Sequence, residues 1–212
     1  MEELLQRLAQ QINHANKKVI IRISGHGAAG KTTFANKLIN LLDAKANYIN
    51  TDPYIITEVR KYTTIDYEYH HQKYTYKMTA CHPAAHNILA LERDVKMIQQ
   101  GLDFYTIGTH YMESTLVSAK NQVTIVEGMS AAFLKPDLFD LSVYLYTDDE
   151  TELTRRGVRD VSERGAAIHH LTNSHKQRRI QYVLFMHPYH EKFDVVVKNS
   201  TDTCTIEKYD YQ

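Results

Sequence analysis

The stretch GHGAAGKT, residues 25–32, decides the fold of this chain. It matches the pattern G-x-x-x-x-G-K-[ST], whose glycines allow backbone N–H groups to turn toward phosphate oxygens. A short apolar and β-branched run at 17–24 precedes it, and FANKLINLL at 34–42 follows with helical spacing. Strand, loop and helix in this order are the setting in which the pattern forms a phosphate loop. The sequence therefore predicts a binding site for a nucleoside triphosphate.

Two side chains of the loop have distinct expected roles. Lys31 would reach the terminal phosphates, and Thr32 would be a ligand of Mg²⁺. The start of the following helix adds partial positive charge at the phosphates. The alternative is a glycine-rich turn that carries a Lys-Thr pair without binding phosphate. The expected nucleotide-binding residues are Gly25, His26, Gly27, Ala28, Ala29, Gly30, Lys31, Thr32 and Thr33.

Strands and helices alternate along the rest of the chain. Buried-type strands are predicted at 46–51, 122–128, 141–147 and 193–199, with a further strand at 204–209. Helical spacing marks the first dozen residues, 83–101, and a stretch from about 149 to 191 interrupted near Gly165. The apolar face of the 83–101 helix should carry Ile88, Leu89, Leu91, Val95 and Ile98. The segment 103–120 alternates like a β-hairpin or an irregular excursion. This order predicts an α/β fold in three layers, a mostly parallel sheet with helices on both faces.

Composition limits the classes of partner. A chain of 212 residues has the length of one domain, and its 25 Lys and Arg balance 25 Asp and Glu. No bulk charge therefore draws it to nucleic acid or to an anionic membrane. Cys81 and Cys204 are expected to be free thiols in a reduced compartment. The amphipathic N-terminus is unlike a signal peptide, and no apolar run approaches the roughly 18 residues of a membrane span. We expect a cytoplasmic protein that acts on a small molecule, without nucleic-acid or membrane partners; homo-oligomerisation stays open.

A phosphate loop alone does not define the reaction. The chain has no N-K-x-D run for guanine and no apolar strand ending in Asp-Glu, which disfavours a GTPase switch and a motor ATPase. Transfer to a hydroxyl needs Mg²⁺, an acceptor-side carboxylate and positive charge on the migrating group. Glu127, at a strand end, is either a Mg²⁺ ligand or a helix-capping acid. Asp52, about twenty residues after the loop, is a turn residue, a ribose anchor, a metal ligand or a catalytic base.

Arginines gather in LTRRGVRDVSERG, residues 153–165. At helical spacing Arg156 and Arg159 share a face, and Arg155 and Arg164 lie close by. Such a cluster on a short helix suits a lid that closes over a triphosphate and excludes water. The alternative is a solvated helix in which Asp160 and Glu163 pair with the arginines.

Several blocks, in order, resemble the uridine kinase and phosphoribulokinase group of P-loop small-molecule kinases. The blocks are IIRISGHGAAGKTTFANKL (20–38), NTDPYI (50–55), YKMTACHPAAHNILALERDVKMIQQG (76–101), IVEGMSAAF (125–133), LFDLSVYLYTDDETELTRRGVRDVSERG (138–165) and HPYHEKFDVVVKNS (187–200). The resemblance implies one P-loop kinase domain over 1–212, with a lid at about 151–167 and a substrate-side excursion at about 54–120.

The resemblance also implies the chemistry, ATP-dependent phosphorylation of a small-molecule hydroxyl. Asp52 would be the base or the acceptor-orienting carboxylate. Lys31, Arg156, Arg159 and Arg164 would stabilise the transferring phosphoryl group, and Thr32 and Glu127 would hold Mg²⁺. Acceptor-side candidates are Asp52, Tyr54, His82, His110 and Tyr111.

The departures from this group fall on the substrate side. Cys81 and Ala84 stand where the group has an Asp-His-Pro-Asp segment that holds a ribose, and IGTHYMEST at 107–115 replaces its pyrimidine-binding run. The tyrosine-rich run 62–76 is either a substrate-facing lid or a partner surface. A nucleoside is the expected acceptor. The alternatives are a kinase of a sugar phosphate, a pantothenate-like compound or a riboside, and a regulatory nucleotide-binding protein with little turnover.

Overall fold

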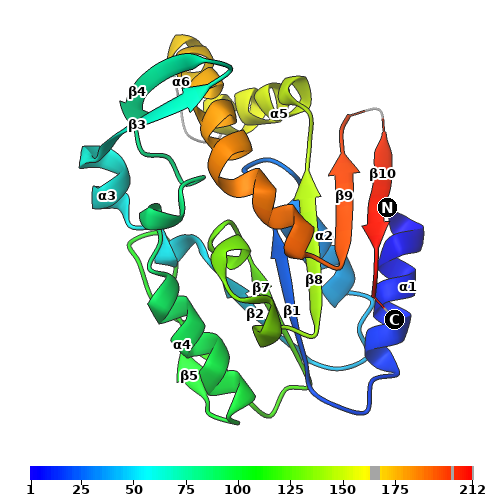
Figure 1. The fold of residues 1–212 in the computed structure, drawn as a ribbon. Helices are drawn as coiled ribbons and strands as arrows, with labels where there is room; N and C mark the ends of the chain where they lie inside the picture. The colour runs from blue at the N-terminus through cyan, green and yellow to red at the C-terminus, as the bar shows by residue number, and fades with distance from the viewer. Residues whose placement is uncertain (163–167, 202, 212) are drawn as a thin grey trace.

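A six-stranded sheet forms the centre of the molecule (Figure 1). The computed structural model describes residues 1–162, 168–201 and 203–211, without the side chains of 159–162 and 168–173. The strand order is β10-β9-β8-β1-β7-β2, and all neighbours are parallel except the antiparallel pair β9 and β10. The strands are β1 Val19–Ser24, β2 Ala46–Asn50, β7 Val123–Glu127, β8 Leu141–Tyr146, β9 Val195–Asn199 and β10 Cys204–Tyr209. The predicted mostly parallel α/β sheet is confirmed.

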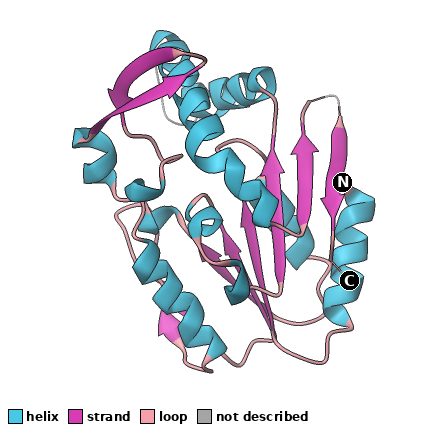
Figure 2. Cartoon of the chain, viewed as in Figure 1, coloured by secondary structure: helices cyan, strands magenta, loops and turns pink. Residues whose placement is uncertain are grey.

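Strand β1 explains why the sheet is covered on both faces. All six of its residues are buried, and they alternate between two cores. Ile21 and Ile23 pack with α1 (Glu2–Asn13) and α2 (Lys31–Ile39), whereas Ile20 packs with α4 (Ile88–Gln99). Because successive side chains of a strand point to opposite faces, a strand whose six residues are all buried requires cover on both sides. Figure 2 shows these helices on either side of the magenta strands.

The register brings the carboxyl ends of three strands together. Glu127 at the end of β7 is paired with Ile23 of β1 on one side and with Asn50 of β2 on the other. The phosphate loop begins two residues after Ile23, and Asp52 lies two residues after Asn50. Ligands of open parallel sheets bind at this edge. The sheet itself therefore places the loop, Glu127 and Asp52 at one end of the molecule.

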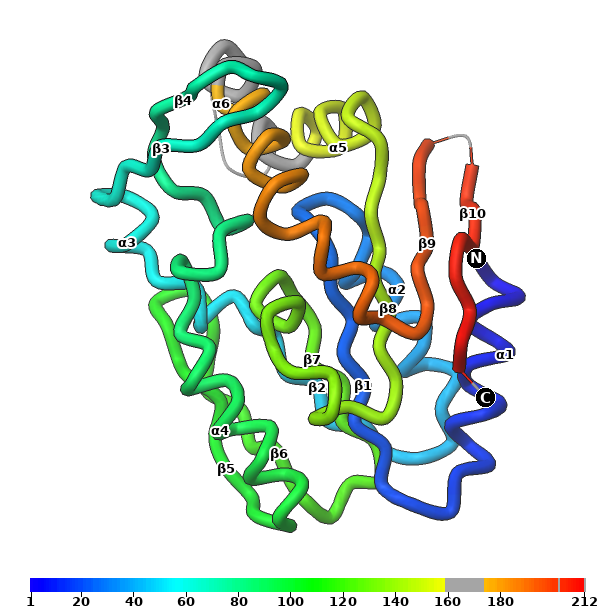
Figure 3. The backbone as a smooth tube through the Cα atoms, viewed as in Figure 1, coloured from blue at the N-terminus to red at the C-terminus, as the bar shows by residue number. Residues whose placement is uncertain are grey.

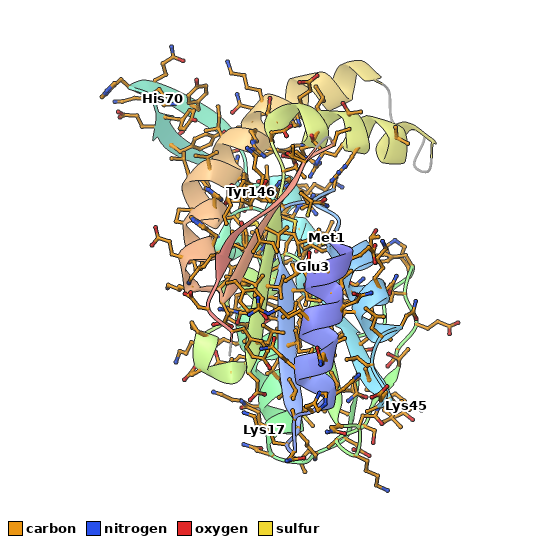
Figure 4. The ribbon with its side chains drawn as sticks, turned by 90° about the vertical axis from the view of Figure 1, so that its right-hand side faces the viewer. Met1, Glu3, Lys17, Lys45, His70 and Tyr146 are labelled. Atoms are coloured by element: carbon orange, nitrogen blue, oxygen red, sulfur yellow. The ribbon has the colours of Figure 1, made fainter. Side chains whose placement is uncertain are left out.

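A separate layer covers this end. It consists of α5 (Asp149–Ser162), α6 (Ile168–Gln181) and an antiparallel hairpin, β3 Thr64–Tyr69 and β4 Gln72–Lys77. Tyr67 Oη donates to Gln177 Oε1 at 2.6 Å and so joins the hairpin to α6. In Figure 4, His70 lies at the outer tip of the hairpin, at the opposite end of the molecule from Lys17 and Lys45.

The β3–β4 hairpin was not predicted from the sequence, although TIDYEY and QKYTYK alternate. Its two-residue turn consists of His70 and His71, with φ of 51° and 60°. Turns with both central residues at positive φ favour Asn-Gly or Gly-Gly, so a His-His pair gives no turn signal.

Other boundaries also differ from expectation. The predicted helix at 83–101 is divided into a 3-10 turn, Pro83–Ala85, and α4, whose start Asn87 caps by accepting from Ala90 N at 3.3 Å. Leu89, expected on the buried face, is 80% exposed. The 103–120 excursion pairs through two-residue strands, β5 Phe104–Tyr105 and β6 Leu116–Val117, and through an isolated antiparallel bridge between Thr109 and Met112. Gly165, the expected break of the late helix, lies outside the described residues.

The remaining elements are short turns. They are 3-10 turns at Asp52–Tyr54, Ser130–Phe133, Pro136–Leu138 and His187–Lys192, a helical turn α3 at Thr57–Tyr62 and a π-turn at Tyr182–Met186. Helix α1 and strand β10 lie side by side (Figure 3), and Tyr209 Oη donates to Gln11 Oε1 at 2.6 Å. Among the described residues, no helix combines the length and the apolar character that crossing a membrane requires.

Candidate active site

A cleft of about 810 Å³ opens at the carboxyl end of the sheet, between the phosphate loop and the covering layer. Its walls come from the loop, the ends of β2, β7 and β9, the turn at Asp52, and helices α3, α5 and α6. The lining includes Gly27, Ala28, Gly30, Lys31, Thr32, Thr33, Asn50, Asp52, Ile55, Arg60, Ala80, Glu127, Arg155, Arg156, Arg178 and Asn199.

The loop backbone requires glycine at its first position. Gly25 has φ of 136°, and a Cβ there would lie 1.7 Å from the carbonyl oxygen of Leu145. At Gly27 the space for a side chain is limited for another reason, since a Cβ there would lie 2.5 Å from Nη2 of Arg156. The guanidinium group of Arg156 therefore rests against the phosphate loop.

The buried imidazole of His26 ties the loop to the end of β8. Its Nε2 lies 2.9 Å from the backbone N of Thr147, which can only donate, so Nε2 accepts and Nδ1 carries the proton. Nδ1–H then donates to Gly27 O at 2.8 Å. Burial lowers the pKa of His26 to about 4. A neutral His26 thus holds the loop, and Lys31 Nζ donates to the His26 carbonyl at 2.9 Å.

Oxygen ligands for a hard cation face the start of α2. Thr32 Oγ1 donates to Glu127 Oε2 at 3.1 Å, and Tyr48 Oη donates to the same oxygen at 2.6 Å. Glu127 is buried, and burial together with this carboxylate raises the pKa of Tyr48. A hydroxyl and a carboxylate beside a phosphate loop are the donor set that Mg²⁺ prefers. The residues present therefore fit this ion.

Asp52 lines the same cleft as the loop lysine. It begins the 3-10 turn after β2, where its backbone N donates to Asn50 Oδ1 at 2.8 Å. Its side chain is exposed and lines the cleft. The carboxylate is thus accessible to a molecule that enters the cleft.

Glu152 of α5 organises the arginines. It is 2% exposed; Oε1 accepts from Arg156 Nε at 2.9 Å, and Oε2 accepts from Arg179 Nη1 at 3.1 Å. His26 Nδ1 lies 3.5 Å from Oε2. Burial alone would raise the pKa of Glu152, but the surrounding basic groups reverse this and lower it. Beside this group, Arg155 Nη1 donates to Asn199 O at 2.9 Å.

A model of the phosphoribulokinase / uridine kinase family matches residues 20–206, which is most of the chain. The chain belongs to this family. Uridine-cytidine kinase 2-B of Danio rerio is 25% identical over 209 residues, covering 95% of this chain and 77% of that protein. A uridine kinase of Macrococcus caseolyticus is 27% identical over 200 residues, covering 88% and 87%.

The solved phosphoribulokinase from Rhodobacter spheroides has the same fold. Its TM-score is 0.62 at 15% identity, with 87% of this chain and 71% of that chain covered. The expected resemblance to the phosphoribulokinase / uridine kinase family is therefore confirmed. This protein is an ATP-dependent small-molecule phosphotransferase of the uridine kinase type.

Most of the predicted kinase residues meet in the cleft of this family member. Lys31, Thr32, Asp52, Glu127 and Arg156 all line it. Gly25, His26 and Ala29 support the loop from its buried side. The side chain of Arg159 and the whole of Arg164 lie outside the described part of the chain.

The acceptor-side residues are less well placed. Tyr54 is a core residue rather than a wall of the cleft, since it is 1% exposed and its hydroxyl donates to buried Asp94. His82 packs edge-on to Phe185, with ring centroids 4.7 Å apart. His110 and Tyr111 are exposed and contact each other, and neither lines the cleft.

Cys81, which stands where the resemblance implied a carboxylate, is buried, and burial raises the pKa of its thiol to about 11. It is therefore a protonated thiol that supplies no charge.

Sequence reasoning missed several residues of the site. Asn50 and Arg178 line the cleft, Glu152 orients Arg156, and Arg60 lies on the wall that Asp52 shares. A motif shows which residues contact phosphate, but a side chain that contacts another element has no local signal. Of these residues, only Asn50 had a place that the sequence could have indicated, because it ends a predicted strand two residues before Asp52.

Proposed function

We propose that the protein transfers the γ-phosphoryl group of ATP to a hydroxyl of a small acceptor, with Asp52 as the acceptor-side base. The observation that supports this most is that Asp52, Lys31, Thr32, Glu127 and Arg156 line one cleft although they come from four segments of the chain. Phosphoryl transfer depends on positioning and on neutralising charge, and this arrangement offers both.

The proposed roles follow from charge and placement. The acceptor oxygen forms a bond to the γ-phosphorus as the bond to the ADP oxygen breaks, and Asp52 takes the hydroxyl proton. Lys31 and Arg156 lie against the phosphate loop and offset negative charge on the migrating group. Arg159 and Arg164 stay proposed lid residues. Thr32 and Glu127 would hold Mg²⁺, which supplies positive charge to the outer phosphates when bound.

The identity of the acceptor is less well defined than that of the phosphoryl donor. The relatives are uridine kinases, so a nucleoside is the first acceptor to test. Yet the residues predicted from the group for the nucleoside, Tyr54, His110 and Tyr111, do not line the cleft.

The test is acceptor-dependent formation of ADP over a panel of nucleosides, sugars, sugar phosphates and vitamin precursors. Asp52→Asn should lower kcat about 10²- to 10⁴-fold, the usual contribution of a general base. Asp137→Asn is the matched control, since Asp137 is exposed and does not line the cleft. An unchanged kcat in Asp52→Asn would refute its role, and no stimulation by any acceptor would favour a regulatory nucleotide-binding protein instead.

A further inference from the structure

A cation stands on the same wall of the cleft as Asp52. Arg60 belongs to α3 and lines the cleft together with Asp52, Ile55 and Ala80. Two backbone hydrogen bonds hold this wall in place, from Ile56 N to Ala85 O and from Asn87 N to Tyr54 O, both 2.8 Å. The segment that carries Arg60 is thus joined to the one that replaces the family's ribose-binding carboxylate.

The guanidinium group of Arg60 is incompletely satisfied. Its Nε is buried and has no hydrogen-bond partner among the residues that the structure describes. Other cations of the lining differ: Lys31 donates to His26 O, Arg155 to Asn199 O and Arg156 to Glu152. A buried N–H without an acceptor is costly, and a charged one more so. Arg60 therefore offers a donor that the described protein leaves unused.

The surroundings of Arg60 contain no described anion that pairs with it. The cleft has two lining carboxylates, Asp52 and Glu127, and within the described residues neither forms an ion pair with Arg60. The neighbouring His86 is engaged elsewhere, with Nδ1 at 2.7 Å from Ser130 Oγ and Nε2 at 2.8 Å from Ala80 O. Cys81 gives no carboxylate at the place where the family has one. Beside Asp52, the acceptor wall therefore carries the cation Arg60 and lacks the second acid that the resemblance implies for a nucleoside site.

We propose that Arg60 binds an oxyanion group, carboxylate or phosphate, of the acceptor. The substrate class would then be a hydroxy acid or a sugar phosphate rather than a neutral nucleoside. The planar guanidinium matches such groups with two parallel hydrogen bonds. This inference rests on the proposed function only in taking the wall with Asp52 as the acceptor side.

A binding measurement tests the proposed role of Arg60 independently of turnover. Protein saturated with MgADP is titrated calorimetrically with matched pairs, ribose and ribose 5-phosphate, and glycerol and D-glycerate, with uridine as a further probe. At least one anionic member should bind more tightly than its neutral partner. Arg60→Gln should weaken that binding about 10- to 100-fold, the effect of losing a charge-assisted hydrogen bond, and Arg60→Lys should fall between. The two pairs distinguish phosphate from carboxylate.

Lys61→Gln is the matched control, because Lys61 is the next residue of α3, is exposed and does not line the cleft. It should leave every affinity within about twofold, as is usual for an exposed charge. The inference is overturned if neither anionic probe binds better than its partner, or if Arg60→Gln keeps the preference.

The same probes in the ADP-formation assay distinguish the two proposals. Phosphorylation of uridine that Arg60→Gln leaves unchanged would keep the proposed function and overturn the anion site. Binding of an anionic probe that depends on Arg60, without phosphorylation of any acceptor, would keep the anion site and overturn the proposed function.

Discussion

Glu152 Oε1 accepts a hydrogen bond from Arg156 Nε at 2.9 Å, one helical turn away, and both side chains are buried. Through the other carboxylate oxygen, Glu152 also accepts from Arg179 of α6. Arg156 in turn lies against Gly27 of the phosphate loop. This one carboxylate therefore connects both helices of the covering layer with the nucleotide side of the cleft.

Replacing Glu152 by glutamine should harm both stability and activity. The change leaves buried Arg156 without its anion and takes one carboxylate partner from half-buried Arg179. Breaking a buried pair costs about 3–5 kcal/mol of the free energy of unfolding. We also expect kcat/KM for ATP to fall about 10-fold or more, because Arg156 loses its fixed orientation. Chemical denaturation and steady-state kinetics measure the two effects. Glu150→Gln, an exposed change in the same helix, should leave both the free energy of unfolding and kcat/KM for ATP unchanged. Equal behaviour of the two variants would contradict the role of Glu152.

His26 should make the protein less stable in mild acid. Its folded pKa is about 4 against an ordinary 6.5, so between these values the unfolded chain binds the proton and the folded protein does not. The contribution to the free energy of unfolding is complete above pH 6.5 and is lost as pH falls toward 4, by about 1.4 kcal/mol per pH unit. Urea unfolding of His26→Gln across this window should show a flatter pH dependence than the wild type. His110→Gln, at an exposed histidine, should keep the wild-type slope.

The first two glycines of the loop should respond differently to alanine. In Gly25→Ala the new Cβ meets the backbone of Leu145 at positive φ, so we expect a loss of more than about 3 kcal/mol of unfolding free energy or no folded protein. In Gly27→Ala the new Cβ meets only the flexible end of Arg156. That variant should unfold within about 1 kcal/mol of the wild type but turn over ATP more slowly. Gly108→Ala, where contacts are ordinary, is the control; a folded, stable Gly25→Ala would refute the clash.

Tyr48 should tune the affinity for Mg²⁺ through Glu127. Tyr48→Phe removes the hydrogen bond that orients the carboxylate, and losing such an outer contact weakens metal binding about 10-fold or more. The measurement is the Mg²⁺ concentration that gives half-maximal ADP formation, and removal of Mg²⁺ with a chelator should abolish the reaction. Tyr146→Phe removes a comparable bond to Glu207, and neither of these residues lines the cleft, so this change should leave the Mg²⁺ requirement unchanged. A normal requirement in Tyr48→Phe would argue against Glu127 as a ligand.

The sequence by itself determined the parallel sheet and the phosphate side of the cleft. Glycine spacing and a Lys-Thr pair between a strand and a helix define a phosphate loop locally, without reference to the rest of the chain. The buried strands were predicted to within about two residues, and β10 at its observed bounds. The places of Asp52 and Glu127 could be predicted because parallel strands end at one edge of the sheet, where ligands bind.

The tertiary structure alone decided the acceptor wall and the arginine network. Tyr54 follows Asp52 by two residues yet is buried against Asp94, forty residues later, whereas Arg60 reaches the cleft. Glu152 was not singled out from the sequence, and it is 2% exposed because α6 and the phosphate loop close around it. The physical reason is the same in each case: burial and partner choice depend on contacts between segments far apart in the chain, and such contacts leave no periodicity or motif within either segment.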